Sequence, residues 1–170
     1  REMLLVSGFS GIGKTRLVME IHKPIIETRG LFVAGKFDQY QRNIPYSSLI
    51  QAFRELLRSI LTLSEDRVTG FRTVLADALG TNGQVIADVI PEVTLLLGAQ
   101  PPVAELPPLE SRNRFHFLFE RFFRAFARKE HPFVLFLDDL QWADRATLEL
   151  LTRLFVSGQT AHLLVIGAYR

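Results

Sequence analysis

The feature that most constrains this chain is a segment near its start, Gly8-Phe9-Ser10-Gly11-Ile12-Gly13-Lys14-Thr15. It fits the pattern G-x-x-x-x-G-K-[ST], in which glycines let the backbone curl so that successive N–H groups point at phosphate oxygens. An apolar run at 3–7 precedes the segment, and helical spacing follows it at 15–23. A plain glycine-rich turn would explain the glycines but not the Lys14-Thr15 pair. The segment therefore predicts a phosphate-binding loop between a strand and a helix, with a nucleotide as its ligand.

Two side chains of this loop carry the predicted chemistry. Lys14 supplies a positive charge to the β- and γ-phosphates, and the Thr15 hydroxyl is a ligand for Mg²⁺. The start of the following helix adds partial positive charge. We assign nucleotide binding to the residues that form the loop and open the helix, namely Gly8, Ser10, Gly11, Ile12, Gly13, Lys14, Thr15 and Arg16.

Two adjacent carboxylates, Asp138 and Asp139, directly follow an apolar run at 133–137. Neighbouring carboxylates repel each other, so a cation is a physical reason for placing both at the end of a buried strand. We expect Asp138 to hold Mg²⁺ opposite Thr15. Asp139 is then placed to orient or deprotonate the water that attacks the γ-phosphate. The alternative for each aspartate is that it only caps the turn that follows.

Three further residues have two interpretations each. Arg170 follows the last apolar run, and the carboxyl end of a parallel strand lies on the ligand-binding edge of an α/β sheet. There it reads the γ-phosphate or stabilises charge in the transition state; the alternative is a solvated arginine. Asp144 is expected to cap a helix rather than bind a metal. Trp142 is expected to be a packing anchor rather than a base-stacking residue.

Four short apolar runs predict the strands, at 3–7, 31–37, 132–137 and 162–168. They are nearly continuous rather than alternating, which is typical of strands buried on both faces of a parallel sheet. Helical spacing predicts helices at 15–23 (ended by Pro24), 46–63, 65–79, 84–97 (broken at Pro91), 111–129 and 144–156. Strands that alternate with helices predict an α/β fold with helices on both faces of the sheet. We expect residues 1–170 to form a single nucleotide-binding domain.

The helix expected at 111–129 is rich in phenylalanine. One helical stripe is expected to pack in the core, and it consists of Phe115, Phe119, Phe122 and Phe126. Phe117 and Phe123 widen the apolar surface beyond one face, which raises the hypothesis of a contact with a segment outside this chain or with a partner.

Composition excludes other classes of protein. The absence of cysteine excludes disulfide scaffolds, thiolate metal sites and cysteine nucleophiles, and the four histidines lack the spacing of metal ligands. A net charge of +2 is too small to argue for nucleic acid. The longest uncharged stretch, 154–169, is interrupted and shorter than the roughly 20 apolar residues of a membrane-spanning helix. We predict a cytoplasmic protein with no membrane span and no metal beyond magnesium.

Three segments together resemble the NTPase domain of STAND-type signalling ATPases, which belongs to the AAA-related, RecA-like branch of phosphate-loop proteins. These are VSGFSGIGKT at 6–15, LDDLQWAD at 137–144 and VIGAYR at 165–170. A fourth, KFDQYQRNIPY at 36–46, is similar to the subtype fused to serine/threonine or histidine kinases in large multidomain regulators.

The resemblance implies a slow ATPase that uses ATP and Mg²⁺ as a regulatory switch. It places Lys14 and Thr15 on the phosphates and magnesium, Asp138 on the magnesium side, Asp139 as the catalytic carboxylate and Arg170 as the γ-phosphate sensor. It also implies the sheet order 2-3-4-1. An adenine-contacting segment, a fifth strand and a helical lid are expected to lie outside this chain.

The chain is accordingly expected to be part of a larger signalling protein, whose other domains, a kinase among them, are its partners. Without a fifth strand the phosphate-loop strand becomes an exposed edge, which leaves room for oligomerisation. Two other functions stay open. One is a nucleotide-binding module without turnover, and the other is a DNA-associated AAA-type ATPase, since origin-recognition-like relatives share these motifs. A weaker third is that the whole protein is a kinase and this segment its scaffold, although no kinase signature occurs here.

Overall fold

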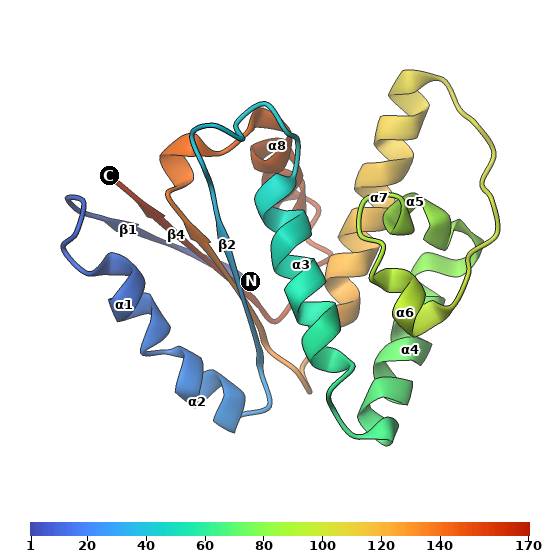
Figure 1. The fold of residues 1–170 in the computed structure, drawn as a ribbon, viewed down its shortest axis with the longest axis horizontal. Coiled ribbons are helices and arrows are strands. Elements are labelled where there is room, and N and C mark those ends of the chain that lie inside the picture. The colour runs from blue at the N-terminus through green and yellow to red at the C-terminus, as the bar shows by residue number, and fades with distance from the viewer. The chain divides into compact units, whose positions relative to one another are not determined.

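The computed structural model describes residues 1–170, which form two compact units. The first unit comprises Arg1–Ala52 and Phe126–Arg170, and the second Phe53–Ala125. The strands are β1 (Glu2–Ser7), β2 (Leu31–Lys36), β3 (Phe133–Asp138) and β4 (Leu163–Tyr169). The helices are α1 (Lys14–Met19), α2 (His22–Glu27), α3 (Ser47–Ile60), α4 (Glu65–Leu79), α5 (Gly83–Ala87), α6 (Val93–Leu97), α7 (Pro108–Phe126) and α8 (Arg145–Val156), with short 3₁₀ turns η1 (Gly80–Asn82) and η2 (Leu140–Trp142) (Figure 1).

The first unit is built on a four-stranded sheet in which every pairing is parallel. Its order is β1-β4-β3-β2, which is the expected 2-3-4-1 order read from the opposite edge. In β3 the whole apolar stretch Phe133 to Leu137 is buried, as a central strand of a parallel sheet requires. In β1, at the edge, Met3, Leu4 and Leu5 are about half exposed. The predicted α/β fold is confirmed.

Helices cover both faces of this sheet (Figure 1). On one face, Val18 of α1 packs in a buried cluster with Val134 and Phe136 of β3 and with Ile166 and Ala168 of β4. On the other face, the start of α3 approaches Gly35 of β2 so closely that a Cβ there would lie 2.9 Å from the Ser48 carbonyl oxygen. Only a glycine permits this approach, because any side chain would collide with that backbone.

The prediction of a single helix at 15–23 is wrong about where that helix ends. Instead of one helix stopped by Pro24, there are two short helices, and Pro24 lies in the first turn of α2. The first turn of a helix has N–H groups without an intrahelical acceptor, so the missing N–H of proline costs nothing there. The carbonyl of Pro24 still accepts a hydrogen bond from the amide of Thr28.

Other predicted helices agree with the structure. The helix at 65–79 has the same bounds as α4. The helix at 84–97 is divided near Pro91 into α5 and α6, as expected. The helix at 111–129 begins earlier, at Pro108, where proline suits the first helical position, and it ends at Phe126.

The second unit is held together by phenylalanine side chains. The ring of Phe53 lies 5.8 Å from that of Phe119, 5.0 Å from Phe122 and 4.7 Å from Phe123, and all four side chains are buried. Edge-on and tilted contacts of this kind are favourable beyond simple burial. Phe123 therefore belongs to the core, and the expected partner contact does not apply to it. Phe117 is 55% exposed, with the Arg121 guanidinium 5.6 Å from its ring centre.

A buried carboxylate also stabilises the second unit. The Glu92 side chain is only 6% exposed, and it accepts hydrogen bonds from Nε of Arg54 at 2.9 and 3.0 Å and from an Nη of Arg58 at 2.8 Å. Burial on its own raises the pKa of Glu92, but the hydrogen bonds from Arg54, a backbone amide and Arg58 together hold the pKa below its ordinary value of 4.5. Glu92, the residue just before α6, thus connects the start of that helix to α3.

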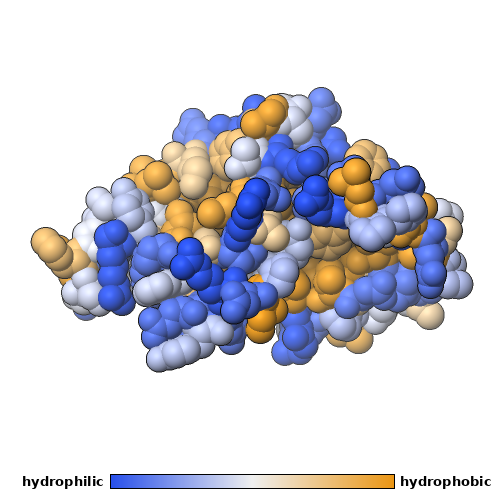
Figure 2. All heavy atoms as spheres, turned by 90° about the horizontal axis from the view of Figure 1, so that it is seen from above, coloured by the Kyte–Doolittle hydropathy of each residue, from blue (hydrophilic) through white to orange (hydrophobic).

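Figure 2 shows apolar side chains reaching the viewed face in several places, interleaved with hydrophilic ones. No helix combines the length and the apolar character that a membrane crossing requires.

We predict that Glu92→Gln lowers the free energy of unfolding near neutral pH by about 2 kcal/mol, the cost of weakening hydrogen bonds to a charged group. Because the folded-state pKa of Glu92 is lowered, its ionised form stabilises the chain above pH 4.5, and this contribution is lost as the pH falls through the folded-state pKa. The difference between the two proteins should therefore shrink under acid conditions. Urea unfolding across pH measures it, with the exposed Glu105→Gln as control. A difference that does not change with pH would contradict the prediction.

Candidate functional site

The loop between β1 and α1 has the backbone of an anion site. Gly11 and Gly13 have φ angles of 80° and 99°, a left-handed conformation that glycine adopts without strain. Gly13 caps α1 in this conformation, and the amides of Gly11, Gly13 and Lys14 have no acceptor within the chain. A curled loop with free N–H groups forms a concave, positive surface that suits a phosphate.

The Lys14 side chain crosses this loop. Its Nζ donates hydrogen bonds to the carbonyl oxygens of Gly8 at 2.7 Å and of Phe9 at 3.1 Å. The ammonium group is therefore held against the first residues of the loop. A phosphate anion bound there would meet both a full positive charge and several N–H donors.

The Thr15 hydroxyl lies next to the end of β3. It donates a hydrogen bond of 2.6 Å to Oδ2 of Asp138, while Oδ1 of Asp138 accepts the amide of Asp139 at 2.9 Å. A hydroxyl beside a carboxylate is a set of hard oxygen donors, and Mg²⁺ in nucleotide sites takes only one or two protein ligands with phosphate oxygens and water. The two residues therefore fit a magnesium ion. No group of three or more His, Asp or Glu side chains forms a separate metal centre.

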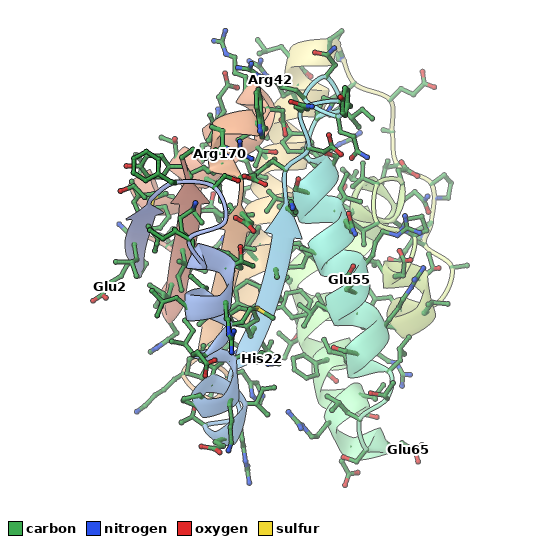
Figure 3. All side chains as sticks on the ribbon, turned by 60° about the vertical axis from the view of Figure 1, so that its left-hand side comes forward. Glu2, His22, Arg42, Glu55, Glu65 and Arg170 are labelled. Carbon is green, nitrogen blue, oxygen red and sulfur yellow. The ribbon has the colours of Figure 1, made fainter.

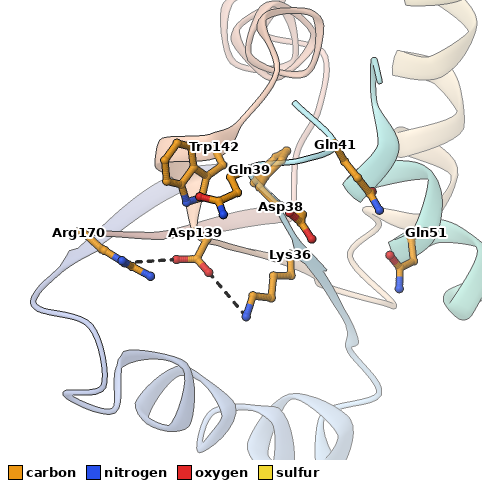
Figure 4. A pocket seen from close by; sticks show the side chains of 9 residues that line it. Lys36, Asp38, Gln39, Gln41, Gln51, Asp139, Trp142 and Arg170 are labelled. Carbon is orange, nitrogen blue, oxygen red and sulfur yellow. Dashed lines mark ion pairs between the residues drawn. The ribbon is translucent and has the colours of Figure 1, made fainter. Parts of the chain in front are cut away.

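Asp139 points away from Asp138 and into a different set of partners. Its backbone is left-handed, with φ 55° and ψ 43°, and it begins the 3₁₀ turn η2. Oδ1 accepts a hydrogen bond from Nε2 of Gln141 at 2.9 Å and lies 4.0 Å from Nε of Arg170, and Oδ2 lies 3.6 Å from Nζ of Lys36. Figure 4 shows the Lys36 and Arg170 side chains reaching Asp139 from opposite sides. The structure thus brings Asp139 and Arg170 together.

The two ion pairs of Asp139 are accessible to water. The side chain of Lys36 is 72% exposed and that of Arg170 56%, against 22% for Asp139. Pairs this exposed contribute about 0–1 kcal/mol each, because water screens them and two long side chains lose freedom. They hold Asp139 in place without making it hard to release.

These charges line an open pocket of about 450 Å³ at the carboxyl edge of the sheet. Its wall is completed by residues of the segment after β2, by α3 and by η2: Phe37, Asp38, Gln39, Gln41, Gln51 and Trp142. Figure 3 shows Arg170 at the end toward which the strands run, whereas His22 lies toward the other end. Ligand sites of open α/β sheets lie at this edge.

Lys36 and Gln141 were not among the predicted site residues. Lys36 is the last residue of β2, and it pairs in register with Asp138 of β3. The rule that carboxyl ends of parallel strands share one edge, which identified Arg170, applies equally to Lys36. For Gln141 the sequence holds no comparable signal, because its position depends on the left-handed turn at Asp139.

Two predictions for the segment after β3 can be compared with the structure. Asp144 is buried and caps α8, since its carboxylate accepts the amide of Thr147 at 2.8 Å and the Thr147 hydroxyl at 2.6 Å. The capping role is confirmed. Trp142 is half-buried and lines the pocket beside Asp139.

A phosphate-type loop after β1 and an acidic end on β3, a parallel strand separated from β1 by β4 alone, define a phosphate-loop NTPase core. Comparison with known families agrees, because residues 1–166 match the AAA ATPase domain family. The chain belongs to this family.

Two curated relatives are histidine kinases. The chain is 41% identical over 157 residues to hybrid signal transduction histidine kinase G of Dictyostelium discoideum, covering 92% of this chain and 4% of that protein. It is 22% identical over 166 residues to histidine protein kinase 1 of Candida albicans, covering 88% of this chain and 7% of that protein. The chain thus spans a small part of each relative. No solved structure matches it significantly.

We predict that the left-handed backbone at Asp139 is strained. The free energy of unfolding of Asp139→Gly should be about 1 kcal/mol higher than that of Asp139→Ala, because only the alanine retains the Cβ that disfavours this conformation. Both variants remove the carboxylate, so the comparison isolates the backbone. Thermal and urea unfolding measure the difference, and equal stability of the two variants would contradict the prediction.

Proposed function

We propose that this chain binds Mg-ATP, hydrolyses it slowly and uses the bound nucleotide to control neighbouring domains of a larger signalling protein. The observation that carries the proposal is the meeting of the phosphate loop with the acidic end of β3, through the hydrogen bond between Thr15 and Asp138. Membership of the AAA ATPase domain family supports ATP as the nucleotide.

The phosphate loop is the segment that we propose to bind the nucleotide. Free amides at Gly11, Gly13 and Lys14 and the Lys14 ammonium supply the donors for the phosphates, with Gly8, Ser10, Ile12 and Arg16 as neighbours in the loop and in α1. Thr15 and Asp138 would hold Mg²⁺, which when bound neutralises charge on the β- and γ-phosphate oxygens.

Hydrolysis falls to the residues around Asp139. We propose that its carboxylate orients and deprotonates the attacking water, and that Arg170 stabilises charge on the γ-phosphate. Both side chains border the open pocket, so water reaches them. Gln141, Lys36 and Arg170, however, all engage Asp139.

These contacts of Asp139 support slow turnover. A carboxylate that is hydrogen-bonded and ion-paired must give up partners before it serves as a base. The same observation favours the second candidate, a nucleotide-binding module that does not turn over. The two differ in whether bound ATP is hydrolysed at all.

The partners follow from the relatives. Both are histidine kinases of which a domain of this size is a small part, 4% of one and 7% of the other. We propose that the nucleotide state is transmitted to other domains of the same polypeptide, a kinase among them. The cytoplasmic location stays a prediction from the sequence.

We predict that calorimetric titration of Mg-ATP into this chain gives saturable binding and that Lys14→Ala weakens it by at least about tenfold, because a charge-assisted contact to phosphate is lost. Lys129→Ala, an exposed lysine in the same unit, is the charge-matched control and should bind as the parent does. Equal affinity in the parent and Lys14→Ala would refute the site.

We further predict that Asp139→Asn keeps Mg-ATP affinity within about threefold but abolishes phosphate release, since the amide cannot accept a proton from water. A phosphate-release assay over hours measures this. If the parent binds but releases no phosphate, the module without turnover is the better description. Unchanged release in Asp139→Asn would remove Asp139 from the mechanism.

A further inference from the structure

We propose that Lys36 recognises the terminal phosphate of a nucleoside triphosphate, so that the site distinguishes a triphosphate from a diphosphate through cations on both sides of Asp139. This inference rests on the proposed function and adds to it a residue that determines specificity. It concerns the end of β2, which neither the phosphate loop nor the acidic pair includes.

The position of Lys36 is fixed by its backbone. It lies opposite Asp138 in the register of β2 and β3, and the amide of the next residue, Phe37, donates to the Asp138 carbonyl at 3.0 Å. The backbone carbonyl of Lys36 accepts a hydrogen bond of 2.9 Å from the Ser48 hydroxyl. Because the Asp138 carboxylate contacts Thr15, a magnesium ion held there would bring the terminal phosphate to the same strand ends.

The side chain of Lys36, in contrast to its backbone, is free to move. It is 72% exposed and has a four-carbon stem, and its ammonium lies 3.6 Å from Oδ2 of Asp139. An ion pair this exposed is weak and is easily exchanged for a more highly charged anion. A phosphate group is such an anion, because it carries more negative charge and more acceptor oxygens than a carboxylate.

The charges around Asp139 leave room for that anion. Two exposed cations, Lys36 and Arg170, face the Asp139 carboxylate, and this cluster shares its pocket with the carboxylate of Asp38. It lines a pocket of about 450 Å³ that is open to solvent rather than sealed by packing. The two exposed cations can donate charge-assisted hydrogen bonds to a terminal phosphate, and a diphosphate has no group in that place.

Exchange of Lys36 from Asp139 to a phosphate has a consequence for the carboxylate. Asp139 then loses one of the two cations that hold it, while Gln141 still orients it through Oδ1. When Lys36 binds the third phosphate, it would thus release the Asp139 carboxylate from its ion pair at the same time.

The test compares two affinities in the same chain, measured by calorimetry with Mg²⁺: that of a β,γ-imido analogue of ATP, which is not hydrolysed, and that of ADP. The parent should prefer the triphosphate. Lys36→Ala should reduce this preference by about tenfold through weaker triphosphate binding with ADP affinity unchanged, and Lys36→Arg should restore most of it. Lys23→Ala, which removes an exposed lysine of α2 in the same unit, is the control and should leave the preference unchanged.

Each failure has a distinct signature. If both nucleotides bind in a Lys14-dependent manner but Lys36→Ala keeps the parent's preference, the role of Lys36 is refuted and the proposed function stands. Equal weakening of both nucleotides would also refute it, because it would show a general effect of charge. If neither nucleotide binds the parent, the proposed function fails, and the inference fails with it. Circular dichroism of Lys36→Ala checks that the fold is intact.

Discussion

The site depends on one hydrogen bond between segments that are far apart in the sequence. The Thr15 hydroxyl and the Asp138 carboxylate, 123 residues apart, meet at 2.6 Å because β1 and β3 are parallel strands of one sheet and end at the same edge. This contact joins the loop that suits phosphates to the carboxylate that suits magnesium. The second oxygen of Asp138 accepts the amide of Asp139, whose left-handed backbone begins η2. Asp139 is therefore turned toward the open pocket.

The Asp139 carboxylate at the sheet edge is held by weak, exposed ion pairs and not by a buried network. The cations that flank Asp139 come from the ends of β2 and β4, the two strands adjacent to β3, and both are more than half exposed. Glu92 in the second unit differs, because it is buried and held by two arginines. A carboxylate like Glu92 stabilises a fold, whereas one like Asp139 can exchange partners when a ligand arrives. This difference is what the proposed nucleotide-dependent switch would require.

The sequence predicts well the sheet and the strand–loop–helix arrangement around residues 8–15, because both depend on local patterns. Apolar runs mark each strand, and the loop motif is contiguous. It predicts less well where a local rule has two outcomes. A proline ends a helix when it falls in the interior but is tolerated in the first turn, and only the tertiary structure decides which case applies to Pro24. Lys36 was not predicted as a site residue, although the strand-end rule that identified Arg170 also applies to it; only its pairing with Asp138 in the sheet shows that it lies beside the acidic pair.

We propose that the phosphate loop and the carboxyl ends of β2, β3 and β4 form one nucleotide site. Hydrogen exchange with and without Mg-ATP, read by mass spectrometry, tests this directly. We predict slower exchange in the loop at residues 8–16 and also at 138–142, the segment that follows β3, with little change in α4 at Glu65–Leu79. Protection of the loop alone would contradict a joint site. No protection at either segment would contradict nucleotide binding by this chain.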